Sequence, residues 1–119
     1  MNLLVLANEL ETATNLCQNL DAIGFTVDAT TTIAGAQSLF LERGGHALIV
    51  ITPDVATGRA RDLIRRLHSV DEDLVVAVFG EETLRGESIA HLHRIKSFHP
   101  DSRAGIGAIQ KITCTLTQA

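Results

Sequence analysis

Short unbroken apolar runs punctuate the first 80 residues of the chain. The clearest one covers residues 47–51 and ends abruptly at Thr52-Pro53-Asp54. A short apolar run rich in β-branched residues and cut off by turn residues is typical of a strand buried on both faces. Residues 2–7 and 74–79 repeat this pattern, and residues 25–29 predict a shorter strand near a sheet edge. The pattern therefore predicts four strands in this part of the chain.

Segments with helical periodicity separate these runs. Apolar side chains recur at helical spacing in residues 11–23, and Gly24 follows as a natural stop. A second helix is expected over residues 33–42, capped by Thr32, and a third over residues 59–69. Strands and helices thus alternate with short connections. This order predicts an α/β fold of the flavodoxin-like kind, a doubly wound parallel sheet in a three-layer α/β/α arrangement.

The last third of the chain, residues 81–119, follows the pattern less closely. Residues 88–98 could form a helix, residues 99–101 a turn, and residues 106–116 a last strand. A complete five-unit sheet usually closes with a full helix, and too few residues remain for one. We therefore expect a single domain over residues 1–119, with a regular core followed by a divergent C-terminal part.

The amino-acid composition argues against several classes of function. The net charge of -4 disfavours nonspecific binding to DNA or to anionic membranes, and four Phe with no Trp or Tyr disfavour a stacking platform for bases. The first apolar run ends at Asn8-Glu9 and is too short for a signal peptide or a membrane span. Cys17 and Cys114 fit no metal spacing. These features predict a cytoplasmic protein that binds neither nucleic acid nor membrane.

The order of these segments resembles the receiver domains of two-component response regulators. Leu-Leu-Val-Leu-Ala-Asn-Glu at residues 3–9 looks like the first strand of that family and its acidic tip. The resemblance covers roughly the first 80 residues. Its other matching segments are residues 24–27, 35–36, 44–50, 62–67 and 74–78.

A working receiver takes a phosphoryl group on a carboxylate at the end of its third strand. An acidic pair after the first strand holds the Mg²⁺ that neutralises the transferred group. At the pair this chain has Ala7 and Asn8, and only Glu9 beside them is acidic. The acceptor position falls on Thr52, or on Ile51 if the loop register differs by one. Of these five positions, only Glu9 offers a carboxylate.

Two more family positions also depart from the pattern. The switch Thr or Ser after the fourth strand is represented by Phe79 or Gly80, and the Lys that pairs with the phosphoryl group by Lys111. Asp54 is the nearby carboxylate, which we expect in the loop rather than at the strand tip. The resemblance therefore implies the receiver scaffold without its phosphorylation chemistry. Such a pseudo-receiver would be no enzyme and would need no metal or cofactor.

Other candidate sites have simpler interpretations. Asn8, Glu9 and Asp54 could form a residual cation site, but solvated loop acids are preferred because Mg²⁺ needs several oxygen ligands. His91 and His93 cannot share a metal on the helix expected there, since positions two apart point in different directions. No base is identifiable beside Thr52, which argues against a nucleophile.

Two surfaces are candidates for a protein partner. A basic cluster on the third helix could bind an acidic partner, and its members are Arg59, Arg61, Arg65 and Arg66. The apolar residues Ile106, Ile109 and Ile112 need burial, and without a closing helix they favour a homodimer or another protein partner.

Two classes of function remain open. The first is a signalling or dimerisation module that acts through protein contacts. The second is a small α/β enzyme or ligand-binding domain that uses Glu9, Thr52 and Asp54, or a phosphorylatable receiver with an atypical site. The absence of a recognisable nucleophile–base pair favours the first class, and fold analogy alone does not decide between them.

Overall fold

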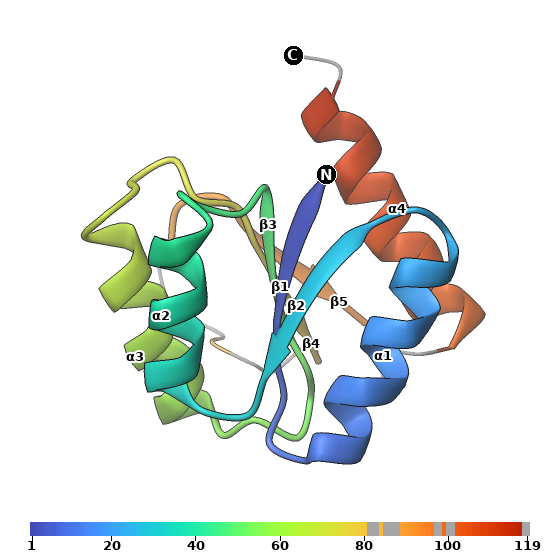
Figure 1. Ribbon diagram of the computed structural model, residues 1–119, viewed down its shortest axis with the longest axis horizontal. Coiled ribbons are helices and arrows are strands. Elements are labelled where there is room, and N and C mark those ends of the chain that lie inside the picture. The colour runs from blue at the N-terminus through green and yellow to red at the C-terminus, as the bar shows by residue number, and fades with distance from the viewer. Residues whose placement is uncertain (81–83, 85–88, 97–98, 100–101, 118–119) are drawn as a thin grey trace.

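The computed structural model describes residues 1–80, 84, 89–96, 99 and 102–117. It has a five-stranded parallel sheet between two layers of helices (Figure 1). The strands lie in the order β2-β1-β3-β4-β5, so the predicted doubly wound, three-layer α/β fold is confirmed. The elements are β1 (Asn2–Leu6), α1 (Leu10–Ala22), β2 (Thr26–Thr30), α2 (Ile33–Glu42), β3 (Leu48–Ile51), α3 (Thr57–His68), β4 (Val76–Phe79), β5 (Leu92–Ile95) and α4 (Arg103–Thr117).

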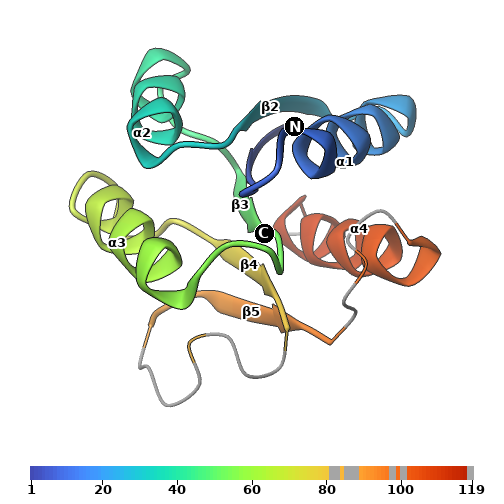
Figure 2. The same cartoon turned by 90° about the horizontal axis from the view of Figure 1, so that it is seen from below.

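The core has two halves, one on each face of the sheet. Helices α2 and α3 cover one face and α1 and α4 cover the other (Figure 2). Because side chains alternate along a strand, β1 sends Leu4 and Leu6 toward α2 and α3, and Leu3 and Val5 toward α1 and α4. All residues of β3 and β4 are buried. This explains why both strands lack polar residues in the sequence.

Local signals set the ends of the first elements. Gly24 has a φ of +104°, a left-handed conformation that a glycine adopts without strain, and it ends the turn after α1. The Thr32 hydroxyl accepts a hydrogen bond from the Gly35 N–H at 2.9 Å, so the predicted N-terminal cap of α2 is confirmed. β2 lies at the edge of the sheet, as the alternating pattern of that segment indicated.

The predictions for the C-terminal third are wrong in two places. Residues 92–95 form the strand β5 where a helix was expected, and residues 103–117 form the helix α4 where a strand was expected. Of the predicted helix and the turn expected after it, residues 88, 97, 98, 100 and 101 lie outside the described residues. In α4 the buried positions are Gly105, Ile109 and Thr113, which recur every four residues. That spacing belongs to a helix with one face against the sheet.

The closing helix changes the interpretation of the apolar stretch. Ile109 is fully buried, and Ile106 and Ile112 pack partly buried against the same half of the core, beside α1. The burial of Ile109 contradicts its assignment to a partner surface, whereas Ile106 and Ile112 stay partly exposed on α4. The argument for a homodimer through this segment loses its basis. Within the described part of the chain, no helix has both the length and the apolar character needed to cross a membrane.

Candidate functional site

The polar residues expected to carry chemistry gather at the carboxyl ends of β1 and β3, the lower end of the sheet in Figure 1. Leu6 pairs with Ile51 at the end of the ladder, and the Thr52 N–H donates to the Leu6 carbonyl at 3.1 Å. Ala7 is fully buried. Ligands of open α/β sheets bind at this end, so the residues that follow these strands define the candidate site.

Asp54 connects the loop after β3 to the start of α1. Its carboxylate accepts a hydrogen bond from the Thr52 hydroxyl through Oδ1, and one from the Glu9 N–H through Oδ2 at 2.9 Å. Partial burial raises the pKa of Asp54, but the bonds from the Thr52 hydroxyl and from backbone N–H groups outweigh that effect and leave the pKa below its ordinary value. Asp54 is therefore ionised, and it accepts a hydrogen bond from Glu9, the residue before α1.

The contact between Thr52 and Asp54 corrects one expectation. No base was expected beside Thr52, yet the Asp54 carboxylate accepts a hydrogen bond from its hydroxyl. This pair is nevertheless a poor nucleophile and base. The Thr52 side chain is buried at 1% exposure, and a carboxylate with a lowered pKa has little tendency to take a proton.

Arg59 is the feature of this end of the sheet that the sequence did not reveal. It lies in the first turn of α3 and donates from Nη1 to Asn8 Oδ1 at 2.8 Å and from Nη2 to the Thr31 carbonyl at 2.9 Å. One guanidinium thus ties α3 to the loops after β1 and β2. The sequence placed Arg59 only in a basic cluster, because a contact between residues 8 and 59 leaves no local signal.

Ile51 and Phe79, two further receiver positions, are the last residues of β3 and β4, and both side chains are apolar and buried. Ile51 is buried between the sheet and the layer of α2 and α3, and Phe79 is buried on the opposite face. Lys111, the candidate for the family's Lys, lies within α4 and not in the strand expected over residues 106–116. β5 ends at Ile95, so Lys96 is the lysine that directly follows the last strand.

The metal hypotheses gain no support from the described residues, among which no three His, Cys, Asp or Glu side chains group to hold an ion. The Asn8 Nδ2 lies 3.5 Å from the Glu9 Oε1, at the limit of a hydrogen bond. His93 is exposed in β5, and His91 precedes that strand with a left-handed φ of 58°. The two histidines are therefore on or beside an edge strand and not on the predicted helix.

A second polar cluster ties the edge strand β2 to the turn before β3. Asp28 accepts hydrogen bonds from Arg43 Nε and Nη2, both at 3.2 Å, and its Oδ2 lies 2.8 Å from the buried His46 Nε2. Burial raises the pKa of Asp28, but these bonds from His46 and Arg43 outweigh it and lower the pKa overall. The His46 side chain is fully enclosed, so we interpret this cluster as structural.

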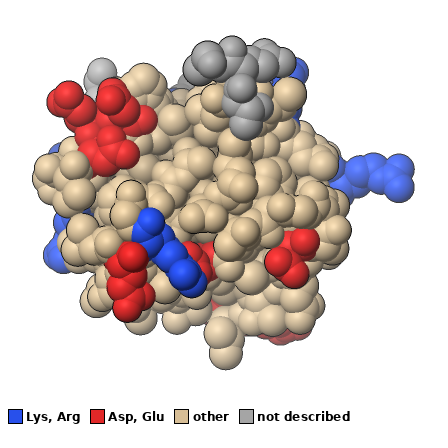
Figure 3. All heavy atoms as spheres, turned by 45° about the horizontal axis from the view of Figure 1, so that its top comes forward, with Lys and Arg blue, Asp and Glu red and all other residues tan. Residues whose placement is uncertain are grey.

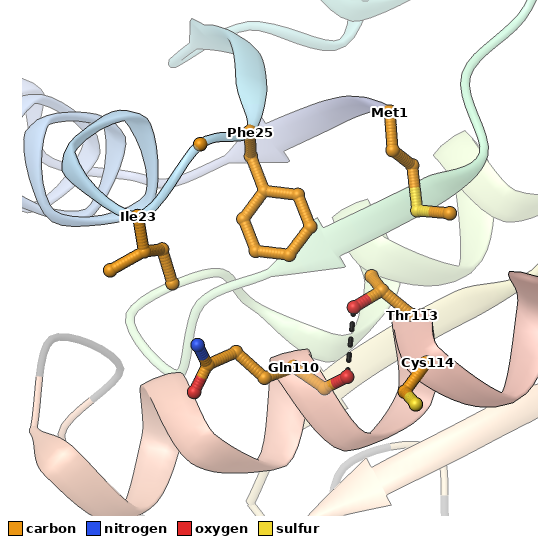
Figure 4. Close-up of a pocket in the computed structure, with 7 residues that line it drawn as sticks. Met1, Ile23, Phe25, Gln110, Thr113 and Cys114 are labelled. Atoms are coloured by element: carbon orange, nitrogen blue, oxygen red, sulfur yellow. Dashed lines mark hydrogen bonds between the residues drawn. The ribbon is translucent and has the colours of Figure 1, made fainter.

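A hollow of about 330 Å³ lies at the opposite end of the molecule from the strand tips. On the face that Figure 3 shows, charged side chains stand mainly away from the centre. The hollow opens between the end of α1 and α4 (Figure 4), and its lining residues are Met1, Ile23, Gly24, Phe25, Gln110, Thr113 and Cys114. The Thr113 hydroxyl donates to the Gln110 carbonyl at 2.9 Å. No lining residue is Asp, Glu, Lys, Arg or His, so the hollow offers no general acid or base from these side chains.

Comparison with known proteins identifies the fold. No family model and no curated protein matches the sequence. Solved structures do match it. TrrA from Thermotoga maritima in complex with Mg²⁺-BeF gives a TM-score of 0.70 at 14% identity, over 97% of both chains. CheY4 of Vibrio cholerae gives 0.73 at 11% identity, over 93% of this chain and 97% of its own.

The non-phosphorylated receiver domain of HemR from Leptospira biflexa gives a TM-score of 0.67 at 19% identity, over 97% of this chain and 93% of its own. Identities this low show the fold alone. The chain therefore has the fold of a response regulator receiver domain.

Proposed function

We propose that this chain is a pseudo-receiver, a signalling module that works through protein–protein contacts and does not accept a phosphoryl group. The receiver fold supports the signalling role. TrrA, one of the structures with this fold, is also described in complex with the histidine kinase ThkA, and that form matches this chain with a TM-score of 0.68 at 15% identity. In this role the domain is not an enzyme and needs no cofactor.

The observation that carries the proposal is the chemistry at the end of β3. Phosphoryl transfer needs an accessible carboxylate there, together with a cation that neutralises the charge of the transferred group. Ile51 is apolar and buried, and the buried Thr52 hydroxyl is already donating to Asp54. Both oxygens of Asp54 accept hydrogen bonds from within the chain. These residues serve structure and leave no acceptor prepared for transfer.

Arg59 supports the same conclusion from the side of the cation. Mg²⁺ prefers several oxygen ligands and binds carboxylates above all. The Asn8 side-chain oxygen, at one position of the family's acidic pair, is bonded to the Arg59 guanidinium, and Ala7 at the other position has no ligand atom. The positively charged Arg59 side chain thus binds the oxygen atom that a metal ion would use. The loops are held without a metal.

Beryllofluoride with Mg²⁺ tests this proposal, since TrrA is described in a complex with it and serves as the positive control. We expect amide ¹H–¹⁵N shifts of the loops after β1 and β3 to stay unchanged, apart from weak effects that Mg²⁺ alone reproduces. A saturable change that Asp54→Asn abolishes and Asp62→Asn preserves would contradict the proposal. Asp62 is the matched control because it is a carboxylate of α3 paired with Arg66.

A further inference from the structure

A groove of about 400 Å³ runs along α3, on the side that faces the segment before β5. We call it the α3 groove. Its lining residues are Arg61, Ile64, Arg65, His68, Ser69, Ile89 and Ala90. Of these described residues, three carry basic nitrogen atoms and none is acidic. This part of the surface is therefore richer in basic side chains than the chain as a whole, whose net charge is -4.

The basic side chains of the groove share one face of the helix. Arg61, Arg65 and His68 are spaced four and three residues apart, which aligns them along α3. Arg61 is engaged elsewhere in the chain, whereas the exposed Arg65 guanidinium has no hydrogen-bond or ion-pair partner among the described residues. An anionic ligand beside Arg65 would provide a partner for this exposed guanidinium.

The opposite side of α3 shows how a basic residue is used when its role is internal. Arg66 donates from Nε to Asp62 Oδ1 at 3.0 Å and from Nη1 to Gln37 Oε1 at 3.1 Å. These bonds connect α3 to α2 and neutralise the charge of Arg66. The contrast between Arg65 and Arg66, adjacent in sequence and on the same helix, separates the groove from a general basic helix surface.

The groove also has an apolar floor. Ile64 is buried and Ile89 packs partly buried against the same half of the core. An aliphatic side chain placed there would gain contact with both isoleucines while a flanking carboxylate reaches Arg65. The His68 Nε2 lies 3.2 Å from the Leu74 carbonyl, which fixes the orientation of the ring. The groove therefore combines an exposed arginine with an apolar base.

We propose that the α3 groove binds an acidic segment of a partner protein, with an aliphatic side chain on Ile64 and Ile89 and a carboxylate at Arg65. This inference rests on the proposed function, because it names the class of partner for the interaction module. A peptide fits better than a nucleic acid, because none of the described lining residues is Phe, Tyr or Trp, which would stack a base.

Fluorescence anisotropy with a short labelled peptide of alternating Glu and Leu residues tests the proposal on the full chain. We expect saturable binding that weakens with salt, and ¹H–¹⁵N shifts confined to α3 and residues 89–90. Arg65→Glu should weaken binding roughly tenfold, since it replaces a charged hydrogen bond by repulsion, while the matched Arg66→Glu should change it less than about twofold. Ala90→Asp, an exposed position in the groove, should also weaken binding.

Control peptides separate the two features of the groove. Replacing Glu by Lys should abolish binding, and replacing Leu by Ser should weaken it. Equal losses in Arg65→Glu and Arg66→Glu, no saturable binding, or tighter binding of a single-stranded oligonucleotide than of the peptide would overturn the proposal. If the groove does not bind the peptide, the proposed function is not refuted, because this binding assay contains no phosphoryl donor and does not measure phosphorylation. Phosphorylation at the strand tips would refute the proposed function without changing the affinity measured for the peptide in the α3 groove.

Discussion

Removing the Arg59 side chain is the perturbation that most directly probes how the strand-tip loops are held. Arg59→Ala deletes two hydrogen bonds, to Asn8 Oδ1 at 2.8 Å and to the Thr31 carbonyl at 2.9 Å. A hydrogen bond from a charged donor contributes about 1.5–3 kcal/mol when it is sheltered, and much less when water competes. Because Asn8 is exposed and Thr31 half-buried, we expect a total loss of about 1–2 kcal/mol in the free energy of unfolding.

Thermal and urea unfolding measure this loss. A destabilisation of this size should lower Tm by about 3–10 °C in a domain of 119 residues. Hydrogen exchange should accelerate at the amides near Asn8 and Thr31 and stay unchanged in β3 and β4. Arg59→Lys should recover less than half of the loss, since one ammonium cannot reproduce the two-pronged contact of a guanidinium.

Arg65→Ala is the matched control for this prediction. It removes the same side chain from the same helix, at an exposed position without a partner among the described residues, so we expect a change within about 0.5 kcal/mol. Equal unfolding energies for Arg59→Ala and Arg65→Ala would refute the reasoning. Hydrogen exchange that accelerates evenly over the sheet would also refute it, because the contacts of Arg59 hold only the loops at one end of the sheet.

The remaining predictions concern the core, the ionised Asp54 and one close approach. Ile109→Ala should lower the urea-unfolding free energy by about 2–5 kcal/mol, as at a buried site, and light scattering should give the same mass as for the parent chain; a loss below about 0.5 kcal/mol would instead indicate a surface position. Asp54 has a pKa below its ordinary 3.8, so its contribution to stability is present above that pH and is lost as the pH falls through the lower folded value. The stability difference between parent and Asp54→Asn should therefore shrink on acidification below about pH 4, and a difference that grows would contradict the assignment. Gly35→Ala should destabilise, because an added Cβ would lie 2.7 Å from the capping Thr32 hydroxyl, whereas Gly58→Ala, with no atom within 4 Å, should be neutral or stabilising by thermal melts; equal effects would contradict this account.

The regular part of the fold could be predicted because its signals are local. The unbroken apolar runs of β3 and β4 reflect burial on both faces, and glycine and threonine mark where α1 ends and α2 begins. The helix α2 was predicted at its observed bounds, Ile33–Glu42. In these segments the propensity of each residue agrees with its tertiary position.

The C-terminal third failed because composition and spacing gave conflicting signals. Ile106, Ile109, Ile112 and Thr113 are β-branched and favour a strand, yet the burial of Ile109 and Thr113 every fourth residue is that of a helix against the sheet. Tertiary packing prevailed over propensity. The structure also changes the place of Lys111, which lies in α4, whereas Lys96 directly follows β5.

The sequence alone showed which side chains follow β1 and β3, but not which contacts hold the loops of the candidate site in place. Ala7, Asn8 and Thr52 stand in recognisable places in the sequence, so the loss of carboxylates could be read directly. The contacts of Asp54 with Glu9, and of Arg59 with Asn8, join residues 45 and 51 positions apart. Such contacts depend on how the loops fold over the strand ends, for which a single sequence gives no pattern.

Incubation with acetyl phosphate and Mg²⁺, followed by intact mass spectrometry, tests the central claim most directly. The account predicts no gain of a phosphoryl group, because Ala7, Asn8 and Thr52 replace the carboxylates and Asp54 is bonded to Thr52 and Glu9. Asp54→Asn and Thr52→Val would assign any gain to its residue. A phosphoryl group that forms on the parent chain and is lost with Asp54→Asn would contradict the account, as would one that is lost with Thr52→Val.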